Sequence, residues 1–417
     1  MSDTPVPVTS VLRARADVGD RAARALTAEL ARDNAAKHVL LVEVAPGSML
    51  VDAAIDALLP GDTMTVVPAS VDQTAQLRAE IAGHGPWVDE RVRVIETASA
   101  ADPADLLIIG TVLTGSGEQA RVMIDGYGKY LTEGAVLSVA VAALPGGTSG
   151  AAAELDRQVA LFGVGSDLVL RNVPPLRVHR LRFTPAPVDR AAKLGPAFRT
   201  SSVPLTRGMY IDSSGVAAAG IALGLAAATR LARPKSRLWL LPALAAGPVA
   251  AFFRDPQRDV PEDPTAVVAA SDGRVLSVER VHDERLGATG FLRIAVFLSV
   301  LDVHVNRSPV AGRVVDHFVT DGGFAAAMKP AAEHNVAAYT VLETARGRVV
   351  VAQRTGMVAR RIAHRAPVGS LLAKGERFGL IRFGSRTDVY LPADAAEALV
   401  GPGDRVAGGS SVIARWR

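Results

Sequence analysis

The residue pair with the clearest chemical potential is Gly384-Ser385, in the stretch Gly379–Pro392 near the C-terminal end. Apolar residues alternate with small or polar ones on both sides of the pair, which predicts two strands that meet at a tight corner. Because glycine has no Cβ, the Gly384 peptide can bend enough for the Ser385 hydroxyl to reach the preceding carbonyl. Attack on that carbonyl would replace the amide by an ester. The pair is therefore a candidate for self-cleavage of the backbone.

Cleavage of such an ester would leave a new chemical group on the serine. Loss of the Ser385 α-proton would expel the Gly384 carboxylate and leave a dehydroalanine, which hydrolyses to a pyruvoyl group. A pyruvoyl carbonyl condenses with amines and withdraws electrons, as pyridoxal phosphate does. The dipeptide alone is weak support, because Gly-Ser also occurs at 47–48, 115–116, 165–166, 369–370 and 409–410.

The C-terminal half also contains residues suited to acid–base chemistry. A hydroxyl nucleophile needs a base, and a base works best when a carboxylate orients it. Asp272 lies in the turn Ser271–Gly273, which would expose its carboxylate, and His304 lies in an Asp-Val-His-Val run. Each also has an ordinary interpretation, as an Asp-Gly turn and as a surface histidine on a strand. His334 and His364 are alternative bases. The chain has no cysteine, which excludes thiolate chemistry, and we expect no metal site.

Five segments, in their order and spacing, resemble one known family. They are Phe252–Pro256, Ser271–Gly273, Asp302–Gly312, Gly356–Ile362 and Gly379–Pro392. Over residues 205–417 the chain resembles the pyruvoyl-dependent phosphatidylserine decarboxylases, in their compact bacterial and archaeal form. The resemblance implies a zymogen whose self-processing triad is Asp272, His304 and Ser385.

The resemblance also implies the products of processing and the reaction. Cleavage between Gly384 and Ser385 would give a large chain and a small chain, residues 385–417, with a covalent pyruvoyl cofactor on Ser385. The enzyme would remove CO2 from phosphatidylserine in the membrane to give phosphatidylethanolamine. The pyruvoyl carbonyl would condense with the lipid amine, and His304 would then protonate the α-carbon. Archaetidylserine is a second candidate substrate, and a homodimer is a candidate assembly.

Basic residues near the motifs are candidates for binding the substrate. Arg307, Arg382 or Arg386 would hold the lipid phosphate, and structural salt bridges are the alternative role for all three. Arg307 stands where longer family members have a second histidine, and Phe383–Arg386 replaces their Leu-Gly-Ser-Thr. His304 would therefore act both as base and as proton donor, or another histidine would be the base.

Residues 1–190 predict a different domain. Strand-like runs such as His38–Val44 and Leu106–Gly110 alternate with helical segments, which predicts a parallel sheet with crossover helices. Residues 35–145 weakly resemble the Rossmann-like fold of S-adenosylmethionine-dependent methyltransferases. That fold needs a glycine-rich first loop, but Val44–Ser48 has one glycine and a proline. We expect a non-catalytic domain; the alternative function is a methyltransferase with an accessory β domain.

Two apolar runs follow a linker at 191–210. Gly215–Ala232 and Leu238–Phe253 flank the basic segment Arg233–Arg237, which predicts an apolar helical hairpin over residues 211–254. The runs are marginal in length for crossing a bilayer. We expect a re-entrant or interfacial hairpin at the cytoplasmic face of the cell membrane. The alternative is a helix pair buried in a soluble core.

Residues 255–417 predict a mainly antiparallel β-barrel or sandwich, the decarboxylase domain, because short apolar runs alternate with glycine turns. Residues 1–204 have a net charge of −4 and residues 205–417 one of +8. The basic half favours anionic lipid. We expect no nucleic-acid partner, because no basic run is interleaved with aromatic residues. The N-terminus shows no secretory signal. A non-enzymatic membrane scaffold, with Ser385 uncut, is a third hypothesis.

Overall fold

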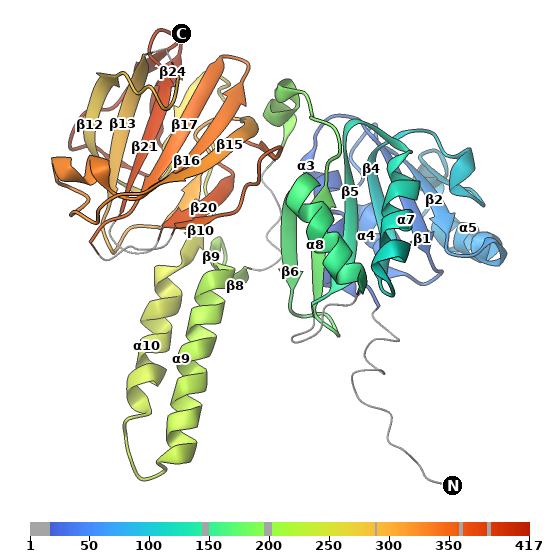
Figure 1. Cartoon of the computed structure of the whole chain (residues 1–417). Coiled ribbons are helices and arrows are strands. Elements are labelled where there is room, and N and C mark those ends of the chain that lie inside the picture. Colours follow the sequence, from blue (N-terminus) through green and yellow to red (C-terminus); the bar gives the residue numbers. More distant parts are fainter. Residues whose placement is uncertain (1–16, 144–149, 196–201, 288–289, 358–361, 382–384) are drawn as a thin grey trace. The chain divides into compact units, whose positions relative to one another are not determined.

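The computed structural model describes residues 17–143, 150–195, 202–287, 290–357, 362–381 and 385–417. The chain divides into two compact units, Met1–Thr200 and Ser201–Arg417. Each unit has its own hydrophobic core. Figure 1 shows the first unit in blue to green and the second in green to red.

The first unit is an α/β domain built on one seven-stranded sheet, with strand order β3-β2-β1-β4-β5-β7-β6. The strands from β3 to β5 are parallel, whereas β7 is antiparallel to both of its neighbours. The buried strands are apolar runs because helices cover both faces of the sheet (Figure 1). The expected Rossmann-like domain is confirmed.

The strands of this sheet are β1 (His38–Val44), β2 (Thr63–Pro68), β3 (Val92–Val94), β4 (Ala104–Leu113), β5 (Leu131–Ala142), β6 (Gly163–Val169) and β7 (Leu176–Leu181). The helices are α2 (Asp20–Leu26), α3 (Ala28–Arg32), α4 (Met49–Ala57), α5 (Thr74–Ala82), α6 (Pro86–Asp89), α7 (Gly117–Gly128) and α8 (Gly150–Phe162).

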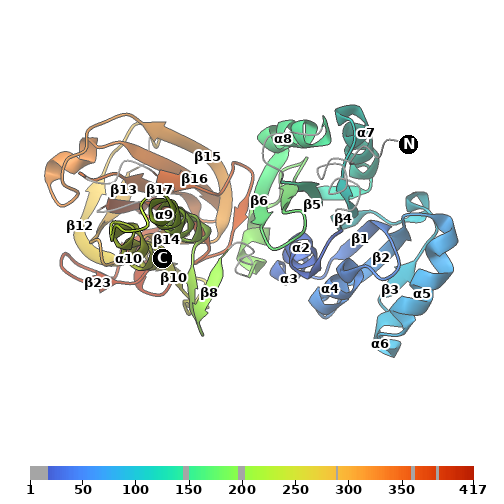
Figure 2. The same ribbon diagram turned by 90° about the horizontal axis from the view of Figure 1, so that it is seen from below.

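The second unit begins with a helical hairpin, α9 (Ser213–Ala232) and α10 (Leu240–Phe252). The two helices lie side by side in both views (Figures 1 and 2). By length and composition α9 could cross a membrane, and only 11% of its apolar window is buried. At the base of the hairpin, β8 (Val203–Thr206), β9 (Met209–Ile211) and β10 (Arg254–Pro256) form a small sheet.

Contacts at this base fix the hairpin to the rest of the unit. The Asp212 carboxylate caps α9 by accepting a hydrogen bond from the Ser214 amide, at 2.9 Å. It also receives two bonds from the Arg365 guanidinium, at 2.5 and 2.7 Å. A Cβ at Gly215 would lie 2.5 Å from the Cβ of Phe253, so only glycine allows this close approach.

The remainder of the second unit is antiparallel. The large sheet has eight strands in the order β19-β15-β16-β17-β21-β13-β12-β23, and two three-stranded sheets, β11-β24-β22 and β14-β20-β18, accompany it. Residues of the large sheet and of β11 and β24 share one core cluster, so these sheets pack face to face. The expected β-rich domain is confirmed.

The strands of the large sheet are β12 (Gly273–Val281), β13 (Phe291–Leu298), β15 (Gly312–Thr320), β16 (Ala337–Thr344), β17 (Gly347–Arg354), β19 (Leu371–Leu372), β21 (Ser385–Pro392) and β23 (Arg405–Val406). The smaller sheets contain β11 (Ala266–Val268), β14 (Val305–Arg307), β18 (Ile362–His364), β20 (Arg377–Ile381), β22 (Ala396–Ala398) and β24 (Val412–Trp416).

Candidate active site

Ser385 is the first residue of β21, near the middle of the large sheet. It pairs with Leu298 of β13 and is fully buried. Within the described part of the chain its Oγ has no hydrogen-bond partner. A buried hydroxyl without a partner is costly, so such an atom often marks a reactive site. The expected cleavage partner Gly384 and the basic candidate Arg382 lie outside the described residues.

The alternation of β21 directs its side chains to two different faces of the sheet. We call the face that includes Val296 and Val389 the core face. Thr387 is paired with Val296, so Thr387 and Ser385 point to the core face. Arg386 points to the opposite face. The two neighbours Ser385 and Arg386 are therefore separated by the sheet.

His304 lies immediately before β14. Its backbone carbonyl accepts a hydrogen bond from the Ile381 amide at 3.2 Å, in the strand that leads toward Ser385. Its Nδ1 bonds the Asp302 carbonyl at 2.9 Å, which requires a proton on Nδ1. The opposite ring atom, Nε2, is buried and has no partner among the described residues. His304 is thus held with Nε2 unprotonated, the form that accepts a proton.

An aromatic cover keeps this imidazole neutral. The ring of Phe252, at the end of α10, lies 4.3 Å from the His304 ring, centroid to centroid. Burial lowers the pKa of His304 to about 4, because the charged imidazolium would lose its hydration. At neutral pH the ring is therefore an uncharged base.

Asp272 lies in the turn before β12, where Gly408 and Arg258 hold its carboxylate. Oδ1 accepts from the Gly408 amide at 2.8 Å, and Oδ2 accepts from Arg258 Nη2 at 2.6 Å. The structure therefore pairs Asp272 with Arg258, while a backbone carbonyl orients His304. Gly273 has φ +149°, and a Cβ there would lie 2.1 Å from the Phe297 carbonyl oxygen, which explains the Asp-Gly sequence.

Two short links bring the predicted segments into one region. The Ser271 and Thr387 hydroxyls are 2.6 Å apart, which joins the Asp272 turn to the strand of Ser385. The Arg307 amide donates to the Ala270 carbonyl at 2.8 Å, which joins the same turn to the His304 segment.

The sequence reasoning missed a pair of buried amides, Gln353 on the core face of the large sheet and Asn306 on β14. Gln353 is opposite Thr387 in the register, and its Nε2 donates to Asn306 Oδ1 at 2.7 Å. Both residues are fully buried, yet Asn306 Nδ2 and Gln353 Oε1 have no partner among the residues described. The sequence signal was the asparagine two positions after His304, which by itself indicates no chemistry.

Arg307 and Arg386, two of the basic candidates, lie in ion pairs. Arg307 Nη2 donates to Asp255 Oδ1 and to the Pro256 carbonyl, each at 2.8 Å. Arg386 Nε donates to Asp388 Oδ1 at 2.5 Å, on the face opposite Ser385.

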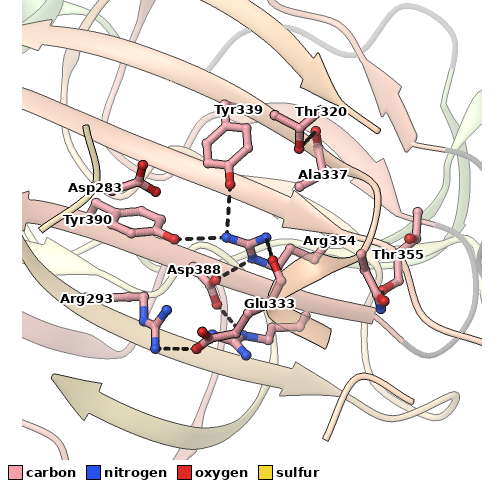
Figure 3. A network of polar contacts seen from close by, with 12 residues as sticks. Asp283, Arg293, Thr320, Glu333, Ala337, Tyr339, Arg354, Thr355, Asp388 and Tyr390 are labelled. Atoms are coloured by element: carbon pink, nitrogen blue, oxygen red, sulfur yellow. Dashed lines mark hydrogen bonds and ion pairs between the residues drawn. The ribbon is translucent and has the colours of Figure 1, made fainter. Parts of the chain in front are cut away.

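Figure 3 shows the polar network on that opposite face. Arg354 is at its centre: Nε donates to Asp388 Oδ2 at 2.7 Å, and Nη2 donates to the hydroxyls of Tyr339 and Tyr390, each at 3.0 Å. Burial opposes the charge, but the carboxylate of Asp388 outweighs it and raises the pKa of Arg354. Asp388 thus binds two arginines, and the network fixes β21 beside Ser385.

The alternative bases lie in different surroundings. His334 lines a pocket of about 690 Å³ on the opposite face, together with Arg293, Arg354 and Tyr390. His364 stacks on another histidine ring, and its Nε2 bonds the Ala366 carbonyl at 2.5 Å. Of His304, His334 and His364, only His304 has a buried nitrogen without a hydrogen-bond partner among the residues that the structure describes.

The first loop of the N-terminal sheet is already occupied by acidic side chains. The Gly47 amide donates to Glu80 Oε2 at 2.7 Å, and the Tyr127 hydroxyl donates to Glu43 Oε1 at 2.5 Å. Glu43 has φ +58°, an unusual value for a non-glycine residue. Across the described ranges, no group of three metal-binding side chains is placed to hold an ion.

Comparison with known proteins finds solved structures and protein sequences that are similar to parts of this chain. Solved structures similar to part of the chain include the glycopeptide N-methyltransferase MtfA, with 13% identity over 43% of this chain and 100% of that chain and a TM-score of 0.32. TrmN from Thermus thermophilus shows 14% identity over 42% of this chain and 52% of that chain, with a TM-score of 0.31.

The relatives by sequence are closer. A phosphatidylserine decarboxylase proenzyme from Symbiobacterium thermophilum is 49% identical over 182 residues, 42% of this chain and 84% of the relative. The proenzyme from Carboxydothermus hydrogenoformans is 42% identical over 165 residues, 39% of this chain and 78% of the relative. The model of the phosphatidylserine decarboxylase family matches residues 247–414. The chain therefore belongs to the phosphatidylserine decarboxylases, a family of carboxy-lyases.

Proposed function

We propose that the chain removes CO2 from phosphatidylserine to give phosphatidylethanolamine, through a pyruvoyl group that it makes from Ser385. The observation that supports this most concerns two buried atoms, Ser385 Oγ and His304 Nε2, which have no hydrogen-bond partner among the described residues and lie on segments joined by the Ile381 hydrogen bond. The family membership of the C-terminal half agrees with it.

The proposed self-cleavage assigns a role to each atom. Ser385 Oγ attacks the Gly384 carbonyl carbon, and its proton passes to His304 Nε2. The C–N bond then breaks, the nitrogen takes the proton, and an ester remains. Loss of the Ser385 α-proton expels the Gly384 carboxylate, and water converts the dehydroalanine to a pyruvoyl group with release of ammonia.

The surroundings of Ser385 fit a carbonyl group at this position. The site is buried, and Asn306 Nδ2 is a hydrogen-bond donor without a partner among the described residues. When formed, the pyruvoyl group supplies a carbonyl that takes up the electrons released with CO2. His304 Nε2 would take up a proton from water and deliver it to the α-carbon in place of CO2, so that one histidine acts both as base and as proton donor.

We propose that Asp272 acts on the site by fixing the turn beside Thr387, since its carboxylate pairs with Arg258 and Gly408. The imidazole takes its orientation from the Asp302 carbonyl. Arg307 keeps β14 beside β10 through Asp255.

We propose that Arg382 binds the lipid phosphate. Arg386 is committed to Asp388 on the other face of the sheet. Arg382 is therefore the one of the three basic candidates that we assign to the phosphate, and archaetidylserine would satisfy the same contacts.

We propose that the α9–α10 hairpin holds the enzyme at the cytoplasmic face of the membrane. Leucines such as Leu223, Leu225, Leu241 and Leu244 are more than half exposed on it. A helix of 20 residues is about 30 Å long, the thickness of the hydrocarbon core. Residues 255–417 would be the decarboxylase domain and residues 1–190 a non-catalytic domain.

The test compares two serines that each follow a glycine. Ser385→Ala should leave one uncut chain and abolish CO2 release from phosphatidylserine. The control Ser410→Ala, also in a Gly-Ser pair, should be cut and active like the wild type. CO2 release by the Ser385→Ala protein would refute the proposal. A wild-type chain that stays uncut and releases no CO2 would also refute it and would favour the alternative functions.

A further inference from the structure

A short turn beside the site presents two large apolar side chains to solvent. It spans Ser299–Asp302 and connects β13 with His304. Leu301 is 83% exposed and Val300 is 55% exposed. Both occupy the central positions of the turn, which the Asp302 amide closes by donating to the Ser299 carbonyl at 3.0 Å.

The turn is held rigid by its own polar residues. Asp302 Oδ2 accepts from the Ser299 amide at 2.8 Å and from the Ser299 hydroxyl at 2.7 Å. The other oxygen, Oδ1, accepts from Arg405 Nη2 at 3.0 Å. Because the backbone is fixed, the two apolar side chains are offered as a preformed pair.

The turn is tied to the base of the hairpin. Arg254, two residues after α10, donates from Nη2 to the Leu301 carbonyl and from Nη1 to the Ala251 carbonyl, the latter at 3.3 Å. Arg254 therefore links the apolar tip of the turn to the C-terminal end of α10, the helix that carries the exposed Leu241 and Leu244. Two arginines, Arg254 and Arg405, flank the tip.

We propose that the turn Ser299–Asp302 is a second membrane-contacting element, whose Val300 and Leu301 enter the interface of an anionic bilayer beside the hairpin. Apolar side chains gain free energy on leaving water, and the positive charge of Arg254 beside the tip is attracted to an anionic surface. The inference rests on the proposed function, since a lipid substrate requires the site to reach the headgroups.

The turn lies between two residues of the site, so its contact with the membrane would bring the site to the lipid headgroups. Leu298, the residue paired with Ser385, precedes the turn, and His304 follows it by two residues. Insertion of the tip would place both ends of the turn at the level of the headgroups. The lipid carboxylate would then reach the site with its acyl chains still in the bilayer.

The experiment measures binding to vesicles of phosphatidylcholine and phosphatidylglycerol. It uses full-length Ser385→Ala protein, so that binding is independent of cleavage and turnover. The double variant Val300→Ser/Leu301→Ser should bind about tenfold more weakly or worse, since one leucine side chain alone accounts for that much. Val319→Ser, at another exposed apolar residue of the same unit, should bind as before.

A second measurement, the fluorescence of an introduced tryptophan, makes the test independent of folding defects. In the Leu301→Trp variant the added fluorescence should shift to the blue with vesicles and be quenched by brominated lipid. Unchanged vesicle binding of the double variant, or an unquenched tryptophan, would overturn the proposal. So would a change in oligomeric state with unchanged vesicle binding, which would mark the turn as a contact between copies. With Ser385 restored, the double variant should still cut itself, and failure of the wild type to cut would instead contradict the proposed function.

Discussion

Phe252 covers His304: their rings lie 4.3 Å apart, at an angle of 40° between planes. Phe252 is the last residue of the apolar hairpin, and His304, directly before β14, is the proposed base. The same contact thus packs the hairpin onto the site and removes water from the imidazole.

This contact predicts the pH dependence of self-cleavage. Burial lowers the pKa of His304 to about 4, so the ring stays a neutral base down to that pH. The cleavage rate should be flat between pH 5 and 8 and fall only as the pH approaches 4. The rate is measured on freshly refolded proenzyme by the loss of full-length chain.

The variant Phe252→Ala should raise that pKa toward its ordinary value of about 6.5 by admitting water. The pH at which the cleavage rate has fallen by half on the acidic side should then rise by about one pH unit or more. An unchanged midpoint would show that another group limits cleavage. The burial of His304 also makes folding proton-sensitive: its contribution to stability is present above about pH 6.5 and is lost as the pH falls toward 4.

His304→Ala should slow self-cleavage by about 10²- to 10⁴-fold, the usual effect of losing a general base. His334→Ala and His364→Ala are the controls, because one lines the pocket on the opposite face and the other has its Nε2 bonded to a carbonyl. Loss of cleavage in either control, with His304→Ala still cut, would reassign the base.

The network on the opposite face predicts a large loss of stability. Arg354→Met would leave Asp388 as a buried carboxylate with one fewer cation, and breaking a buried ion pair costs about 3–5 kcal/mol. The melting temperature of the uncut Ser385→Ala protein should fall by more than about 6 °C.

Arg280→Met is the matched control for this network. Arg280 and Asp394 form an ion pair at 3.8 Å that is largely exposed. Exposed pairs contribute about 0–1 kcal/mol, so the melting temperature should hardly change. Equal effects of the two substitutions would contradict the role given to the Arg354 network.

The N-terminal domain should not respond to S-adenosylmethionine. The Gly47 amide of its first loop donates to Glu80, and Glu43, at the end of the preceding strand, accepts from the Tyr127 hydroxyl of α7. A ligand at one hundred times its Kd would stabilise the domain by about 2.7 kcal/mol. We expect an unchanged melting temperature, and a clear rise would support the methyltransferase hypothesis.

The sequence predicted the parts of this molecule that local patterns determine. Apolar runs predicted the strands of both units, and alternation around Ser385 predicted the two strands β20 and β21. The break between helical runs predicted the hairpin. The motifs also pointed to Asp272, His304 and Ser385, whose segments the structure joins through backbone and side-chain hydrogen bonds.

Pairings between distant residues could not be predicted in this way. The partner of Asp272 is Arg258, the orienting group of His304 is a backbone carbonyl, and Gln353 reaches Asn306 from another sheet. Such contacts depend on strand register and on which face a side chain takes. A shift of one residue would exchange Ser385 with Arg386.

The most direct test of the central claim is the intact mass of the small chain, before and after reduction with borohydride. The account predicts a fragment of residues 385–417 that begins with a pyruvoyl group in place of serine and gains two hydrogen atoms on reduction. A single chain of 417 residues in active enzyme, or a fragment that begins with unmodified serine, would contradict it.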